Sequence, residues 1–558
     1  MQTVGNKGSD VYTSTGDPRL DLSVNCVRKA DPEKLEPILK SVLALNTNQA
    51  LEDAFVLAFH ARNVRGGKGE RDIFQTLFKT LFKEKPEIAK KCLELIPHYG
   101  CWNDVFEFAN THPLAAESIL SMVVDQFKKD EATPNGQSIS LLAKWAPREH
   151  KHPELHKCLA YKMFPTVKHH SSKMKRYRQM VAKLNKRLNT VETYMCGDRW
   201  DEIKPETVPG RAGKIYNRAF LNLPSTYKDK DAPRNTLTYR KPDDPKRMAC
   251  REHFTAHFTA AAEGKAKVHG AATLFPHEVV KKATHSSDQT EDEKNHLRGV
   301  WRGFVSKLTS SGGLGRSIFM SDFSGSMQTS SAGDTPYWVS MALGILGSEV
   351  CTEEFKNKLM TFDSNPVWHT FPEGADLFTK IRSIQSSRVG QGLSTDFQKA
   401  MDLVLQTLKD RRVRPGQEPE NLIVLTDMNW DAACGSHETS RYTGNRYRHV
   451  VKTDGWQTHV EMIKEAFKRA GEDMWGEGQG FVPPRIVIWN LAASPQTDYH
   501  AQADVPGVAM LSGWSPAQFE VLQKEGPRQL TAYEILRMEL DDAKYDRVRQ
   551  AVRAAAAV

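Results

Sequence analysis

One short stretch of the sequence carries oxygen-bearing side chains at a spacing that suits a metal ion. The apolar run 317–321 is followed by Asp322, Ser324 and Ser326, with Gly325 between the two serines. A short apolar run predicts a buried strand, and the glycine favours a tight turn after it. Hard divalent cations prefer oxygen ligands, and Mg²⁺ usually keeps water molecules beside one or two carboxylates. The stretch therefore predicts one loop of a divalent-metal site.

Two later loops supply the other oxygen groups that such a site needs. Thr395 precedes the helical spacing of residues 397–408, and Asp427 ends the apolar run 421–426. Together with the Asp-x-Ser-x-Ser stretch, these loops resemble the metal-ion-dependent adhesion site of von Willebrand factor A domains. The resemblance implies that the three hydroxyls touch the ion and that the two carboxylates act through bound water. It also implies an open coordination position for a carboxylate of a partner.

Two alternatives stay open for these loops. Ser394 lies beside Thr395, and either hydroxyl could be the ligand. Asp, Ser and Thr are also ordinary residues at helix amino termini, so the three loops could be unrelated capping sites. Because order, spacing and strand context agree, we predict a metal site for Mg²⁺ or for another divalent cation such as Mn²⁺ or Ca²⁺.

The elements that position these loops alternate between strands and helices from residue 316 onward. Strands are predicted at 317–321, 358–362, 422–427, 485–490 and 508–511, and helices at 337–348, 376–384, 396–408, 459–470 and 517–523. This alternation predicts a doubly wound, mostly parallel sheet of Rossmann type, covered on both faces. Ligands of such sheets bind at the carboxyl ends of the strands, where Asp322 and Asp427 lie.

The first half of the chain predicts helices only. Apolar residues recur at helical spacing within 35–43, 50–61, 72–82, 86–96, 102–108 and 114–127. Short helices joined by short turns predict an α-helical, HEAT-like repeat solenoid, although no strict period is present. A polar connector is predicted at 285–296, a short helix at 297–308 and a glycine-rich boundary at 310–315.

The predicted architecture is therefore a multidomain α + α/β chain. Residues 1–30 form an N-terminal segment, 31–309 a helical domain, 316–528 an A-like domain and 529–558 a helical tail. A length of 558 residues agrees with more than one domain, because single cores seldom exceed about 250 to 300 residues.

The composition predicts an intracellular protein. No apolar run approaches the roughly 20 residues that span a bilayer, and residues 1–10 lack the apolar core of a signal peptide. The eight cysteines are scattered and form no C-x-x-C pair, which argues against a zinc site and against a disulfide framework. We expect the cytoplasm, with the nucleus as a second compartment.

Positive charge is concentrated in the middle of the chain. Residues 141–250 contain about 25 Lys and Arg against about 11 Asp and Glu, whereas the whole chain carries a net charge of +9. Residues 173–188 predict a basic amphipathic helix with an apolar stripe that includes Met174, Tyr177, Val181 and Leu184. Its predicted RNA-binding residues are Lys173, Lys175, Arg176, Arg178, Lys183, Lys186 and Arg187. Lys and Arg on one face can neutralise phosphates and release counterions.

Aromatic residues lie among these charges. Tyr177, Tyr194, Trp200 and Tyr216 could stack on unpaired bases. The alternative is that Tyr177 belongs to the helix core and that the basic face is only solvated.

Several local motifs carry a wider resemblance. The stretches 194–203, 208–209 and 216–220, within a helical half that precedes an A-like domain, resemble the TROVE proteins, the Ro ribonucleoprotein family. The resemblance covers most of the chain. It implies a helical ring that binds structured RNA on a basic outer face and single-stranded ends within its hole.

The same stretches look still closer to a related, uncharacterised family of unknown function, and three further motifs resemble that family as well. They are Thr426-Asp427-Met428, Trp489-Asn490-Leu491 and the stretch 511–515. In both families the same two halves are joined in one chain.

Catalysis is not predicted. The sequence lacks Gly-x-Ser-x-Gly and H-E-x-x-H, and the loop 65–70 lacks the spacing and the Ser or Thr of a Walker loop. This loop is better interpreted as an interhelical turn than as a phosphate cradle. A hydrolase that uses Asp322 and Asp427 is conceivable, but the resemblance to A domains implies an ion that binds ligands rather than one that activates water.

The leading functional prediction is a Ro-like RNA-binding scaffold for non-coding or structured RNA. Its A-like domain would bind a divalent metal and dock an acidic residue of a protein partner, without a membrane. The alternative is a non-enzymatic protein-interaction or assembly module without RNA. The segment 429–455 after Asp427 either gates the metal loop and recognises the partner or is a disordered insertion.

Overall fold

The computed structural model describes residues 2–4, 10–224, 239–285, 289–328, 334–352, 354–363, 365–387, 397–428, 456–494, 497, 499–524 and 530–557. Within it the chain forms two compact units. The α/β unit combines Met1–Ser41, Phe275–Ser286 and Phe304–Asp541, and the helical unit combines Val42–Leu274, Ser287–Gly303 and Asp542–Val558. The predicted ligand Thr395 and the segment 429–455 lie outside the described residues.

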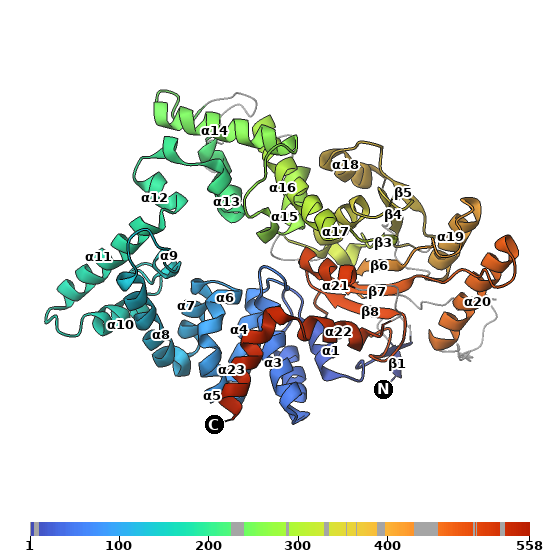
Figure 1. Cartoon of the computed structure of the whole chain (residues 1–558), viewed down its shortest axis with the longest axis horizontal. Helices are drawn as coiled ribbons and strands as arrows, with labels where there is room; N and C mark the ends of the chain where they lie inside the picture. Colours follow the sequence, from blue (N-terminus) through green and yellow to red (C-terminus); the bar gives the residue numbers. More distant parts are fainter. Residues whose placement is uncertain are drawn as a thin grey trace, which may run out of the picture. The chain divides into compact units, whose positions relative to one another are not determined.

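The α/β unit is built on a six-stranded sheet. Its strands are β3 (Ser317–Ser321), β4 (Lys358–Thr361), β5 (Trp368–Thr370), β6 (Asn421–Thr426), β7 (Arg485–Asn490) and β8 (Val508–Ser512). They lie in the order β5-β4-β3-β6-β7-β8 (Figure 1), and only the edge strand β5 is antiparallel to its neighbour. The prediction of a mostly parallel sheet is confirmed, and each predicted strand agrees to within one residue at either end.

Helices lie between the strands of this sheet along the chain, and one more follows the last strand. They are α17 (Pro336–Glu349), α18 (Leu377–Ser387), α19 (Phe397–Asp410), α20 (Trp456–Trp475) and α21 (Phe519–Lys524). The chain steps from β3 outward to β4 but from β6 to β7 in the opposite direction, so right-handed crossovers put α17 and α20 on opposite faces. The contact of α17 with the sheet requires glycine, because a Cβ at Gly347 would lie 2.1 Å from Cζ of Phe319.

Segments from both ends of the chain complete the α/β unit. The hairpin of β1 (Gln2–Val4) and β2 (Asp10–Tyr12) precedes α1 (Pro18–Asn25) and α2 (Pro32–Ala44), and α15 (Pro276–Thr284) and α22 (Ala532–Leu540) join later. Asp17 caps α1 by accepting a hydrogen bond from the backbone N–H of Arg19. The N-terminal residues are therefore part of the α/β core.

The helical unit contains the predicted succession of amphipathic helices. They include α3 (Asn48–Arg62), α4 (Arg71–Glu84), α5 (Pro86–Cys92), α6 (Ile96–Tyr99), α7 (Trp102–Thr111), α8 (Pro113–Ala132), α9 (Leu142–Trp145), α10 (Pro153–Met163), α11 (His170–Leu188), α12 (Val191–Cys196), α13 (Gly210–Phe220), α14 (Pro245–Ala262) and α23 (Asp546–Ala556). Their first core is aromatic, with the rings of Phe59 and Phe78 5.7 Å apart. The HEAT-like repeat type stays a prediction.

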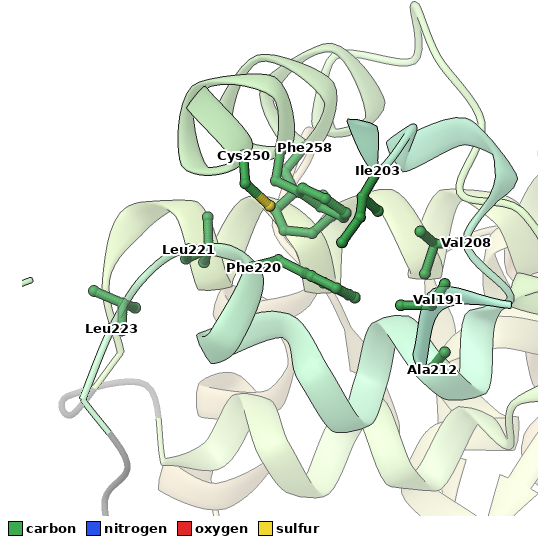
Figure 2. Packing of buried hydrophobic residues seen from close by; sticks show 10 residues of the cluster. Val191, Ile203, Val208, Ala212, Phe220, Leu221, Leu223, Cys250 and Phe258 are labelled. Carbon is green, nitrogen blue, oxygen red and sulfur yellow. The ribbon is translucent and has the colours of Figure 1, made fainter. Parts of the chain in front are cut away.

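A second apolar cluster organises the middle of the helical unit. Phe220 of α13 stacks on Phe254 of α14 with ring centroids 4.3 Å apart. Figure 2 shows the side chains of Phe220, Cys250 and Phe258 gathered in this cluster, with Val191 nearby. This packing holds the stretch 191–223 against α14. The same stretch contains the motifs at 194–203, 208–209 and 216–220.

The transition between the units differs from the predicted connector and glycine-rich boundary. Residues 291–296 are helical, because α16 (Glu291–Ser310) begins at Glu291, and the division between the units passes through this helix at residue 303. The glycine-rich turn lies inside the α/β unit, where the N–H of Gly313 donates to the carbonyl of Leu308. The predicted connector at 291–296 is therefore wrong, for a physical reason: Glu293 is buried in an ion pair with Arg218.

Candidate functional site

Two of the three predicted metal loops, those of Asp322 and Asp427, meet where the order of the strands reverses. β3 and β6 are parallel neighbours, and the chain leaves them toward opposite edges of the sheet. Asp322 directly follows β3, and Asp427 directly follows β6. The N–H of Asp322 donates to the carbonyl of Leu425 at 3.0 Å, which extends the pairing of the two strands to the site. This switch point is where doubly wound sheets bind ligands.

Local hydrogen bonds hold the first loop in shape. Oδ1 of Asp322 accepts from the backbone N–H of Ser324 at 2.9 Å, and its Oδ2 accepts from the hydroxyl of Thr426 at 3.2 Å. The hydroxyls of Ser324 and Ser326 lie 3.0 Å apart. Ser326 is exposed, whereas Asp322 is 1% exposed. The loop thus carries one exposed and one half-buried serine next to a buried carboxylate.

The electrostatics of this loop favour a cation. Asp322 and Asp427 are 1% and 3% exposed. Removal from water, and then the neighbouring carboxylate of Asp427, raise the pKa of Asp322 to about 6, although hydrogen bonds from Ser324 and Thr426 oppose the shift. Two buried like charges are unfavourable unless an opposite charge compensates them. A divalent ion would provide this compensation, and the donor set of carboxylates and hydroxyls fits a hard cation.

The loop that follows β6 and contains Asp427 is shaped by residues that were not among the predicted metal ligands. Met428 has a φ of 64°, a left-handed conformation that is uncommon outside glycine. Its N–H donates to the hydroxyl of Thr426 at 3.1 Å, and its carbonyl lies 3.1 Å from Nε2 of the buried His500. Thr426 therefore links both loops, since its hydroxyl also donates to Asp322. The motif Thr426-Asp427-Met428 was the available sequence signal, whereas nothing in the sequence indicated His500.

The carboxyl ends of β7 and β8 contact the protein's own α1. The amide of Asn490, at the end of β7, donates to the carbonyl of Val24 at 3.0 Å. The hydroxyl of Ser512, at the end of β8, donates to the carbonyl of Ser23 at 2.6 Å. Both motif residues thus fix the last turn of α1.

The described part of the chain gathers no group of three His, Cys, Asp or Glu side chains that could hold a metal. The candidate centre depends on hydroxyls as well as carboxylates, as the sequence predicted. The structure brings together Asp322, Ser324 and Ser326 within one loop and Asp427 beside it.

The predicted RNA-binding helix divides into an apolar and a basic face. Met174, Tyr177, Val181 and Leu184 are all buried, at 8%, 1%, 6% and 1% exposure. Lys175, Arg176, Lys183 and Lys186 are exposed. Successive helical residues differ by about 100°, so these four cations share an arc of about 100°. We call them the α11 basic face. Within the described residues none of the four has a carboxylate partner.

The other three predicted cations have structural roles. Lys173 is buried, and its ammonium donates to the carbonyl of Pro165 and lies 4.5 Å from the ring centroid of Tyr161. Arg178 pairs with Glu149. Arg187 donates to three carbonyls at the end of α8 and beyond it, those of Asp130, Thr133 and Pro134. These contacts withdraw Lys173 and Arg187 from the surface that RNA could use, whereas Arg178 stays exposed in a surface ion pair with Glu149.

The interleaved aromatics are also engaged internally. Tyr177 is a core residue, and Tyr194, Trp200 and Tyr216 are partly buried against the apolar cluster of Figure 2. The guanidinium of Arg247 lies 3.7 Å from the ring centroid of Trp200, and that of Arg199 lies 4.4 Å from that of Tyr194. The exposed surface at α11 is therefore one of charge rather than one of aromatic rings.

The fold and its edge residues define an α/β domain with an oxygen-rich cluster at the switch point of a doubly wound sheet. Residues 316–556, less than half of the chain, match a family described as a domain of unknown function (DUF7788). The chain is also 25% identical over 534 residues to an uncharacterized protein of Acanthamoeba polyphaga mimivirus, covering 91% of this chain and 82% of that protein. No helix among the described residues is both long and apolar enough to cross a membrane.

One solved structure is similar over most of the chain. It is the RO (RSR) protein of Deinococcus radiodurans, with 11% identity, a TM-score of 0.37 and coverage of 91% of this chain and 99% of that one. A TM-score this low supports no conclusion about fold or function.

Proposed function

We propose that this protein is a non-catalytic, RNA-binding ribonucleoprotein scaffold. The observation that carries the proposal is the α11 basic face, where Lys175, Arg176, Lys183 and Lys186 are exposed on one side of one helix. Such a row can replace the counterions of a phosphate backbone. The resemblance of the stretches 194–203 and 216–220 to the Ro family supports RNA as the polyanion.

We further propose that the α/β unit is A-like and holds a divalent cation, Mg²⁺ first. Ser324, Ser326 and Thr395 would hold it directly, and Asp322 and Asp427 would balance its charge. The buried carboxylate pair and the neighbouring hydroxyls of Ser324 and Ser326 support this assignment. When bound, the ion would offer a coordination position to a carboxylate of a protein partner. The chain's own residues position the ion and supply no nucleophile.

The RNA proposal is tested by its salt dependence. A fluorescently labelled hairpin RNA with single-stranded ends should bind the full chain at low salt. The four phosphate contacts of the α11 basic face contribute about −2.8 to the slope of log K against log salt for single strands. Affinity should therefore fall at least roughly 50-fold between 50 and 200 mM salt. Absence of binding at low salt would sink the RNA proposal and leave the protein-interaction alternative.

The metal proposal predicts a thermal response to Mg²⁺. Millimolar MgCl₂ should raise the melting temperature, by the equivalent of about 2.7 kcal/mol once the ion is at 100 times its Kd. Asp322→Ala combined with Ser324→Ala should remove this response, because the variant loses one charge and one hydroxyl of the site. Asp473→Ala, which removes an exposed carboxylate of α20 in the same unit, should keep it. An equal response in all three proteins would contradict the site.

The same response should depend on pH. The pKa of Asp322 is about 6 in the folded chain against an ordinary value of 3.8. In the metal-free protein the folded chain therefore binds the proton of Asp322 more tightly than the unfolded chain does. The stability that this proton contributes is present below pH 3.8 and is lost as the pH rises to about 6. A proton competes with the ion, so the Mg²⁺ response should weaken as the pH falls below about 6. A response that is as large at pH 5 as at pH 8 would contradict the role of Asp322.

A further inference from the structure

A group of basic side chains gathers at the loop between α3 and α4, away from the α11 basic face in sequence. Arg65, in this loop, is exposed, and its guanidinium donates to the carbonyl of His98 at 2.8 Å. The N–H of Val64 donates to the carbonyl of Tyr99. The loop is thus attached to α6 by two adjacent contacts, which hold the side chain of Arg65 beside the exposed imidazole of His98.

The C-terminal segment brings a third basic group to the same place. The hydroxyl of Tyr99 donates to the carbonyl of Lys544 at 2.6 Å, and its ring stacks on that of Tyr545 at 5.7 Å. Arg547, two residues later, is exposed. Partial burial, then the charges of Arg547 and Arg65, lower the pKa of His98. Two guanidiniums therefore act on one imidazole.

The two nearby carboxylates, those of Asp542 and Asp546, lie next to other basic side chains. Asp546 pairs with Arg549 at 2.6 Å, and Asp542 lies 3.6 Å from the ammonium of Lys544. Among the described residues, no carboxylate pairs with Arg65, His98 or Arg547. Two guanidiniums that act on one imidazole without a carboxylate partner hold it in its neutral form, and a bound anion would offset their charge and accept hydrogen bonds from all three side chains.

The backbone of the glycine-rich loop does not itself bind the anion. The N–H groups of Arg65 and Gly66 donate to Oδ1 of Asn63, and the N–H of Lys68 donates to the carbonyl of His60. Lys68 is 1% exposed. These contacts agree with the interpretation of an interhelical turn. The available donors are therefore side chains, and guanidiniums recognise phosphate oxygens in a bidentate manner.

We propose that Arg65, His98 and Arg547 form a second phosphate-binding site of the helical unit, and that its ligand is a backbone phosphate of RNA. The source of the phosphate rests on the proposed RNA-binding function. The site itself rests on the side-chain cluster, and it gives the C-terminal segment a role in binding.

The test compares the double variant Arg65→Gln/Arg547→Gln with Lys83→Gln/Lys85→Gln. The control loses the same charge from exposed residues at the end of α4, and neither lysine is among the charges that act on His98. A labelled 20-nucleotide poly(U) RNA is titrated at several salt concentrations. Sodium pyrophosphate is tested separately by thermal shift. We expect about tenfold weaker RNA binding for the first variant and a salt slope less negative by about 1.4, with the control within twofold of the parent.

Each result decides the proposal. Parent-like RNA binding and pyrophosphate response in Arg65→Gln/Arg547→Gln would overturn it, as would an equal loss in the control. If the parent binds no RNA, the proposed function fails. Pyrophosphate stabilisation that only the first variant lacks would then still support the site, with a free phosphate compound as its source. Arg65→Lys/Arg547→Lys keeps the charge and the fold but loses bidentate geometry, so it should bind RNA at an intermediate level.

Discussion

Reversing the α11 basic face by Lys175→Glu, Arg176→Glu, Lys183→Glu and Lys186→Glu is expected to lower RNA affinity at least roughly 100-fold at low salt. Each substitution removes one phosphate contact and adds a charge that repels the backbone. The slope of log K against log salt should become less negative by about 2.8, which is the share of four contacts to a single strand. Anisotropy titrations with the labelled hairpin RNA measure both quantities.

The quadruple variant should fold normally. All four side chains are exposed, and Glu has a helix propensity close to that of Lys and Arg. Arg187 is left unchanged because it holds the carbonyls that follow α8, and its loss would disturb that packing. A matched control reverses four exposed lysines of the helical unit, Lys83, Lys85, Lys91 and Lys267. An equal loss of RNA affinity in both variants would show that net charge alone determines binding. Unchanged RNA affinity of the α11 variant would show that the α11 basic face does not contact the RNA.

The sheet could be predicted because its strands are local signals. Residues 317–321 and 485–490 are apolar runs, and the structure buries every residue of β3 and β7. The edge strand β5 was not predicted, because its three residues form no apolar run and are defined by pairing with β4, as His369 opposite Leu359 shows. Strand pairing between separate segments leaves no such local pattern.

The start of α16 has a helix-capping pattern in the sequence, although the residues that follow it are polar. Thr290 and Glu293 have the spacing of a capping box, and their side chains and backbone N–H groups exchange hydrogen bonds. The sequence 291–296 nevertheless predicted a connector, because it contains no apolar residue that could mark the buried face of a helix. The burial of Glu293 depends on Arg218, 75 residues away, and no local pattern shows such a pair.

In the candidate sites, too, the features that are local in sequence could be predicted, and those that depend on contacts between distant segments could not. Asp322, Ser324 and Asp427 could be predicted because strand ends and short loops are local features, and the structure brings them together. The closing of the sheet edge by α1 could not, because Ser512 and Ser23 are 489 residues apart. On α11, periodicity gave the buried stripe. It could not show which cations were already bound, since the partners of Lys173 and Arg178 lie on other segments.

The second large effect is expected at Tyr545, which attaches the C-terminal segment to the helical unit. Its side chain is 0% exposed, its hydroxyl lies 2.9 Å from Nδ1 of His60, and it accepts from the amide of Asn63 at 3.3 Å. Tyr545→Ala should lower the free energy of unfolding of this unit by about 3–5 kcal/mol, because a large buried ring is replaced by a cavity. Tyr545→Phe keeps the ring and should cost about 1–3 kcal/mol, because two buried polar groups lose a partner.

Hydrogen exchange localises this effect, since a chain with two units need not unfold in one step. Protection should fall in α3, α5 and α23 of Tyr545→Ala, whereas Tyr161→Ala, at an exposed ring, should leave it unchanged. Burial, and then the charge of Lys68, lower the pKa of His60 well below its ordinary value. The unfolded chain therefore binds the proton more readily, and the stability of this attachment should fall as the pH drops below about 6.5. If Tyr545→Ala left the protection of α23 intact, the C-terminal segment would be held by other contacts, and Arg547 would keep its position in the phosphate site without Tyr545.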